Sequence, residues 1–110
     1  SGWGVPEIVA FLQKESQKGK ISVYTEGTFG LLPYAFEIYL GENKNIDIHG
    51  IWPVPTEKPI EVVENAADHP TYFVMYQSQT PPFQWHLELI AEYQKGLNKK
   101  SSMRLYKVTP

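Results

Sequence analysis

An apolar run without alternation, Thr71-Tyr72-Phe73-Val74-Met75-Tyr76, constrains the fold of this chain more than any other segment. Its length and its aromatic and β-branched residues are typical of a strand. A strand that is apolar at successive positions has to be covered on both faces. The run therefore predicts a central strand in a sheet that carries helices on both sides.

The rest of the chain alternates between helical and strand patterns. Apolar residues recur at helical spacing after Pro6, which predicts a first helix there. Another helix is expected after Pro59, the third in chain order, and it should turn Val62, Val63, Ala66 and Ala67 inward. Strands are expected at residues 20–25 and, half exposed because polar and apolar residues alternate, at residues 46–49. A helix is expected at residues 31–40 between them.

This order predicts an α/β domain, a small three-layer Rossmann-like sandwich. Its three parallel strands would lie in the spatial order 2-1-3, and a C-terminal antiparallel hairpin would extend them. The hairpin has an alternative: Ile90 interrupts the alternation of residues 87–93, so a short helix would also fit there. Winding would reverse between the first and third strands, and ligands bind at such switch points.

Composition limits the class of protein. A chain of 110 residues is long enough for one domain, here spanning residues 1–110. A net charge of −2 offers no basic surface for nucleic acid, and the absence of cysteine excludes disulfides and thiolate metal sites. His49, His69 and His86 lack the spacing of metal ligands, so neither a metal nor a cofactor is expected.

The glycine-containing turn Thr25-Glu26-Gly27-Thr28-Phe29-Gly30 marks the expected site of function. It follows a strand and precedes a helix, so its backbone N–H groups can converge near the positive end of that helix. It lacks the Lys-Ser/Thr ending of a P-loop, so a nucleotide phosphate clamp is not predicted.

Polar residues follow each expected parallel strand and should meet at one edge of the sheet. The candidate ligand-binding residues are Glu26, Gly27, Thr28, His49 and Gln77. Their hydroxyl, amide, imidazole and carboxylate groups suit a sugar or phosphate ligand. Polar residues at strand ends also serve simply to complete turns, and that alternative stays open.

Two aromatic residues of the proline-containing loop, Phe83 and Trp85, form a second candidate surface. Exposed, they would face a partner or a membrane; packed inward, they would cap the core. Ser78 lacks the Gly-x-Ser-x-Gly elbow of the hydrolases, and no general acid–base pair is evident, so no catalytic residue is predicted.

Four segments resemble bacterial membrane glycosyltransferases similar to the dolichyl-phosphate-mannose protein mannosyltransferase superfamily. These are residues 2–9 (GWGVPEIV), 24–31 (YTEGTFGL), 48–53 (IHGIWP) and 102–108 (SMRLYKV). In that superfamily a bundle of transmembrane helices precedes a C-terminal domain outside the cytoplasm, and the donor is a polyprenyl-phosphate sugar. The resemblance implies that this chain is such a tail domain, excised from a larger membrane protein. Separately, Ser1-Gly2 is typical of the residues that a cleaved tag leaves behind.

The catalytic acid of that superfamily lies in the membrane part, so no catalytic role carries over to a residue here. The resemblance implies a non-catalytic accessory domain at the extracytoplasmic face of the membrane. Its partners would be the transmembrane portion of the parent protein and a lipid-linked sugar or acceptor. The alternatives are an independent small-ligand-binding α/β module that uses the same strand-end edge and, less favoured, a stand-alone enzyme.

Overall fold

The computed structural model describes residues 4–26, 40, 42–51, 53–75, 81–95 and 98–110, with the backbone alone at residues 83, 94–95 and 98–102. In chain order these residues form two α-helices, one short 3-10 turn and five strands. They are α1 (Val5–Ser16), β1 (Ile21–Glu26), β2 (Ile46–Ile51), α3 (Ile60–Asp68), β3 (Thr71–Met75), η2 (Phe83–Trp85), β4 (Leu87–Lys95) and β5 (Asn98–Val108). The helix expected at residues 31–40 lies outside the described residues except for Leu40, which is buried.

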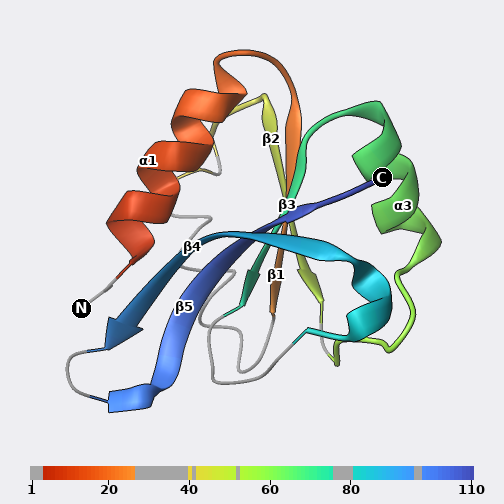
Figure 1. Cartoon of the computed structure of the whole chain (residues 1–110). Coiled ribbons are helices and arrows are strands. Elements are labelled where there is room, and N and C mark those ends of the chain that lie inside the picture. Colours follow the sequence, from red (N-terminus) through yellow and green to blue (C-terminus); the bar gives the residue numbers. More distant parts are fainter. Residues whose placement is uncertain (1–3, 27–39, 41, 52, 76–80, 96–97) are drawn as a thin grey trace.

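All five strands belong to one mixed sheet in the order β2-β1-β3-β5-β4 (Figure 1). β1 pairs in parallel with β2 on one side and with β3 on the other. β5 runs antiparallel to both β3 and β4. The link from β2 to β3 passes over β1 and carries α3 across one face of the sheet.

The expected three-layer Rossmann-like sandwich with an appended hairpin is wrong. The sheet is continuous and mixed, and its two antiparallel strands, of 9 and 11 residues, are longer than the parallel strands of 5 or 6. β5 is apolar toward both faces: Met103 and Leu105 join one core cluster, and Tyr106 and Val108 join the other. A strand buried on both faces belongs inside a sheet, which explains why β5 is a central element rather than an extension.

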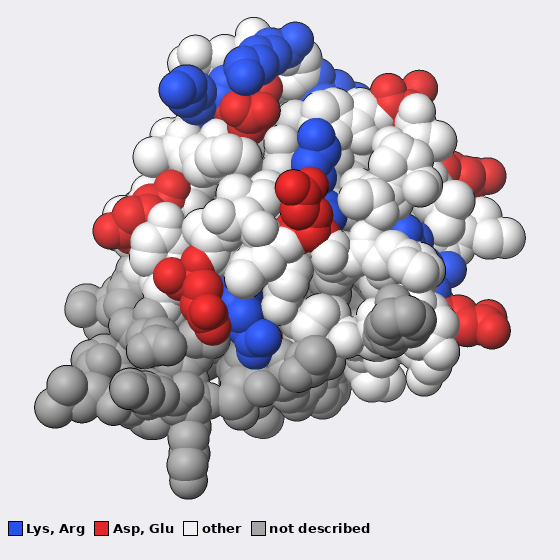
Figure 2. Space-filling model, viewed as in Figure 1, with Lys and Arg blue, Asp and Glu red and all other residues white. Residues whose placement is uncertain are grey.

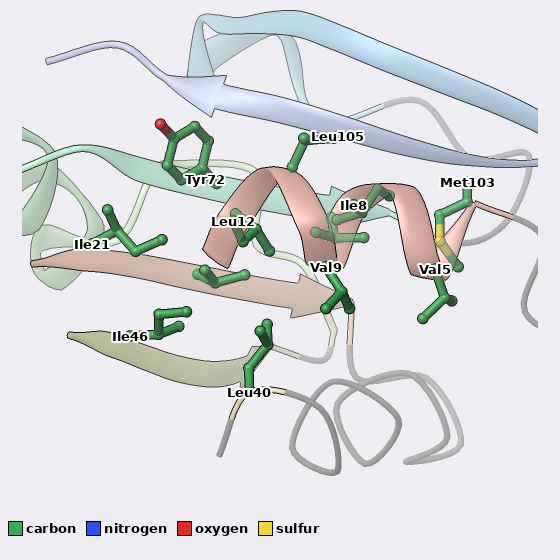
Figure 3. Packing of buried hydrophobic residues seen from close by; sticks show 12 residues of the cluster. Val5, Ile8, Val9, Leu12, Ile21, Leu40, Ile46, Tyr72, Met103 and Leu105 are labelled. Atoms are coloured by element: carbon green, nitrogen blue, oxygen red, sulfur yellow. The ribbon is translucent and has the colours of Figure 1, made fainter. Parts of the chain in front are cut away.

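The core is split by the sheet into two clusters. On one face, α1 places Val5, Ile8, Val9 and Leu12 against β1, β3 and β5, and Figure 3 shows these side chains gathered around Tyr72, Met103 and Leu105. On the other face, α3 contributes Val62 and Ala66 to a cluster with aromatic residues of the sheet. The two helices therefore cover opposite faces (Figure 1).

Two details of the elements differ from the sequence-based expectation. Val63 is 42 % exposed and Ala67 is also exposed, because a helix of nine residues turns only a narrow stripe toward the sheet, here Val62 and Ala66. Residues 87–93 belong to β4, whose pairing with β5 shifts register between Leu89 and Ala91. Ile90 is thus the extra residue of a β-bulge, and it interrupts the alternation for that reason.

The described surface is mixed in charge. Figure 2 shows acidic and basic side chains interspersed over one face, without a continuous patch of either sign. None of the described helices has the length and hydropathy that crossing a bilayer requires.

Candidate functional site

A cavity of about 370 Å³ lies between the sheet and the start of α3. We call it the His49 cavity. It combines residues of β1 and β2 with the proline-containing connection to α3 and with the first turn of that helix. Its described lining residues are Tyr24, His49, Gly50, Ile51, Pro53, Pro55, Pro59, Glu61 and Val62.

Strand register brings the two rings of the cavity together. Tyr24 and His49 are partners across the parallel pair β1–β2, so their side chains leave the sheet on the same face. The phenol and imidazole rings stack with their centroids 5.0 Å apart and their planes 25° apart. Tyr24 is buried, whereas 42 % of the His49 side chain is exposed. His49 therefore presents its ring to the cavity on a support made by Tyr24.

Hydrogen bonds tie β1 to α3 at the same place. The Tyr24 hydroxyl donates to Oε2 of Glu61 at 2.9 Å, and Nδ2 of Asn65 donates to the Tyr24 hydroxyl at 2.6 Å. Glu61 and Asn65 are four residues apart and so lie on one side of α3. The Glu61 carboxylate is thereby held in place, although 62 % of its side chain is exposed.

Tyr24 is a neutral donor rather than an acid–base group at physiological pH. Burial, together with the hydrogen bond to Glu61, raises the pKa of Tyr24 to about 12. The remaining polar groups of the cavity are an imidazole and a carboxylate: Nδ1 of His49 lies 4.0 Å from Oε2 of Glu61. That distance is too long for a direct hydrogen bond and leaves both groups available to a ligand.

The predicted ligand-binding residues are only partly placed by the structure. His49 lines the cavity, as just described. Glu26, the last residue of β1, is fully buried and is not among the described lining residues. Gly27, Thr28 and Gln77 lie outside the described residues.

Three residues of this site were missed by reasoning from sequence: Tyr24, Glu61 and Asn65. The available signal was the four-residue spacing of Glu61 and Asn65 on a helix that Pro59 begins. Nothing in the sequence reveals that they face Tyr24, because 37 residues separate Tyr24 from Glu61.

Of the two alternatives for the second candidate surface, Trp85 follows the inward one. It is fully buried and cannot face a partner or membrane. Its indole stacks on Phe73, and its Nε1 donates a hydrogen bond of 2.9 Å to the carbonyl of Pro55. The indole ring thus has a stacking partner and its N–H has an acceptor inside the protein, as is usual for a buried tryptophan. The side chain of Phe83 lies outside the described residues.

A serine, a histidine and an aspartate also line up near the start of β1. Oγ of Ser22 lies 2.7 Å from Nε2 of His69, and Nδ1 of His69 lies 2.9 Å from Oδ2 of Asp68. The order of groups matches that of a hydrolase triad. Ser22 is only 1 % exposed, however, so its hydroxyl is shielded from a substrate. We interpret this row as a structural link that joins β1 to the turn before β3.

Comparison with known proteins finds no matching family model, no similar curated protein and no similar solved structure. Among the residues that the structure describes, no group of three or more histidine and acidic side chains is placed to hold a metal ion.

Proposed function

We propose that this chain is a non-catalytic accessory domain that binds a small hydroxylated ligand in the His49 cavity. The observation that carries the proposal is the cavity itself, in which an exposed imidazole and a fixed carboxylate stand beside an apolar wall. Carboxylate oxygens accept hydrogen bonds from hydroxyl groups, and a ring nitrogen of histidine can donate or accept them. Ile51, Val62 and the prolines suit the apolar C–H faces of a sugar.

We further propose that the domain belongs to a membrane glycosyltransferase that uses a polyprenyl-phosphate-linked sugar donor. It would lie at the extracytoplasmic face of the membrane and contact the transmembrane portion of its parent protein. Support comes from the sequence resemblance, because two of its four segments, residues 24–31 and 48–53, contribute Tyr24, His49, Gly50, Ile51 and Pro53 to the cavity. The domain would then assist in binding an acceptor or substrate.

The binding proposal is tested by NMR amide-shift mapping with a neutral glycoside such as methyl α-mannopyranoside. We expect roughly millimolar affinity, because a few hydrogen bonds must offset the cost of association. Shifts should cluster at Tyr24, His49, Gly50 and Glu61. His49→Ala should weaken binding, whereas Lys44→Ala, a change of an exposed side chain in the turn before β2, should not. Absence of shifts at high millimolar glycoside contradicts the proposal.

Two further observations test the wider assignment. Purified chain should transfer no sugar from a polyprenyl-phosphate donor, and measured turnover would overturn the non-catalytic role. A series of predicted transmembrane helices encoded upstream in the same reading frame supports the accessory domain. A reading frame without them favours the alternative of an independent ligand-binding module, which the cavity supports equally well.

A further inference from the structure

The charged groups around the His49 cavity are unevenly distributed. Among the described lining residues, Glu61 is the one acidic residue, and none is lysine or arginine. Asp47 lies two residues before His49 on β2, so it leaves the strand on the same face, and the carboxylates of Glu61 and Asp47 both help to raise the pKa of Tyr24. Lys20 pairs with Asp47 at 3.3 Å, which leaves Glu61 as the main fixed charge at the cavity.

The helix end at the cavity does not change this balance. The N-terminus of a helix carries partial positive charge that can attract an anion. Glu61 occupies the first turn of α3, so a carboxylate already interacts with that end. An anionic ligand would have to approach this carboxylate, whose position Tyr24 fixes through the hydrogen bond of 2.9 Å.

We infer that the His49 cavity selects uncharged, hydroxyl-rich ligands and discriminates against sugar phosphates. A carboxylate oxygen can accept more than one hydrogen bond, so Glu61 can receive a ligand hydroxyl while it still accepts from Tyr24. A phosphate at the same position would meet a negative charge and would find no lysine or arginine among the described lining residues to pair with. This inference rests on the proposed function and deepens it: the cavity would bind a neutral acceptor glycan rather than the phosphate-bearing part of a donor.

The test compares methyl α-mannopyranoside with mannose 6-phosphate by amide-shift titration, at low ionic strength and at about pH 8, where a histidine side chain in water is neutral. We expect the phosphate to bind the wild-type chain roughly tenfold more weakly, since like charges a few ångströms apart repel even in water. Salt should narrow this difference by screening the repulsion.

Glu61→Gln keeps the shape of the side chain and removes its charge, so the affinities for the two sugars should converge to within about threefold. Glu64→Gln is the matched control, an exposed glutamate of α3 outside the described cavity lining, and it should retain the wild-type difference. Equal or tighter binding of mannose 6-phosphate to the wild-type cavity overturns the inference and leaves the binding proposal intact. If neither sugar shifts the cavity residues, the proposed function itself fails.

Discussion

Trp85 lies nearly flat on Phe73, with ring centroids 5.1 Å apart and an angle of 18° between the planes. The pair joins the short turn before β4 to the centre of the sheet, and the indole N–H reaches across to the carbonyl of Pro55. Pro55 also lines the His49 cavity. A single core residue thus helps to hold one wall of the candidate site.

Truncation of Trp85 should be among the most destabilising changes in the described part of the chain. Trp85→Ala removes a fully buried ring and should lower the free energy of unfolding by about 3–5 kcal/mol. Trp85→Phe keeps a ring but loses the bond to Pro55, so about 1–2 kcal/mol is expected. Urea denaturation followed by circular dichroism measures both. The adjacent exposed residue provides the control, Gln84→Ala, and equal losses for Gln84→Ala and Trp85→Ala would contradict the core role of Trp85.

Stability should fall on the alkaline side. Burial raises the pKa of Tyr24 and of Tyr72 to about 12, from the ordinary value of 10.0, and also raises the pKa of Tyr106. The unfolded chain then loses these protons first, so the stabilisation is complete below pH 10 and is lost as pH rises through about 12. Unfolding free energies measured across this window, with tyrosinate absorbance in parallel, check the prediction.

Tyr72→Phe provides the matched variant for this test. The Tyr72 hydroxyl makes only a long contact of 3.5 Å with Glu15, so its removal leaves the packing intact. The variant should lose less stability than the wild type between pH 10 and pH 12. Identical alkaline slopes for the two proteins would show that Tyr72 ionises alike in the folded and unfolded chains.

Gly4 should not tolerate a side chain. Its φ of +84° is unfavourable for other residues, and an added Cβ would lie 2.9 Å from Cβ of Tyr93 on β4. Gly4→Ala should therefore cost about 2–4 kcal/mol through strain and overpacking together. Gly19 also has a positive φ but has open space around it, so Gly19→Ala should cost only about 1–2 kcal/mol. Thermal unfolding compares the two, and a larger loss at Gly19 would show that the contact with Tyr93 is unimportant.

Ser22 should act in stability rather than in catalysis. Ser22→Ala leaves Nε2 of the nearly buried His69 without its partner and should cost about 1–2 kcal/mol in urea denaturation. The wild-type chain should not react with a fluorophosphonate probe, because Ser22 is shielded. Labelling that disappears in Ser22→Ala but persists in Thr56→Ala, which changes an exposed hydroxyl residue, would instead establish a reactive serine.

Patterns within single segments were the reliable part of the sequence. The unbroken apolar run of β3 predicts burial on both faces, and all five of its residues are buried. The apolar residues at helical spacing after Pro6 form the buried stripe of α1. The sequence shows that Ile90 interrupts the alternation, but it does not show why. A bulge is defined by the pairing of two strands, so the sequence of β4 alone cannot reveal it.

Spacing along the sequence does not reveal which polar side chains meet at the site. The structure brings Nδ1 of His49 to 4.0 Å from Oε2 of Glu61, a proximity that their positions in the chain do not indicate. The same holds for Ser22 and His69, which are 47 residues apart in the chain. Polar residues from different elements meet only when the register between the strands and the position of the helix across the sheet have been set.

The sequence by itself determined which faces of α1 and β3 are apolar, since this depends on residues that are adjacent in the chain. It also singled out His49 as a candidate site residue, although β2 continues past the expected end at His49 to Ile51, and His49 lines the cavity from within the strand. Only the tertiary structure decided that β5 enters the sheet beside β3, that Trp85 packs inward on Phe73, and that Glu61 accepts a hydrogen bond from the Tyr24 hydroxyl. The physical reason is that the spacing of apolar residues within one element determines which of its faces is buried. The contacts between elements form only when the whole sheet and α3 pack together and exclude water.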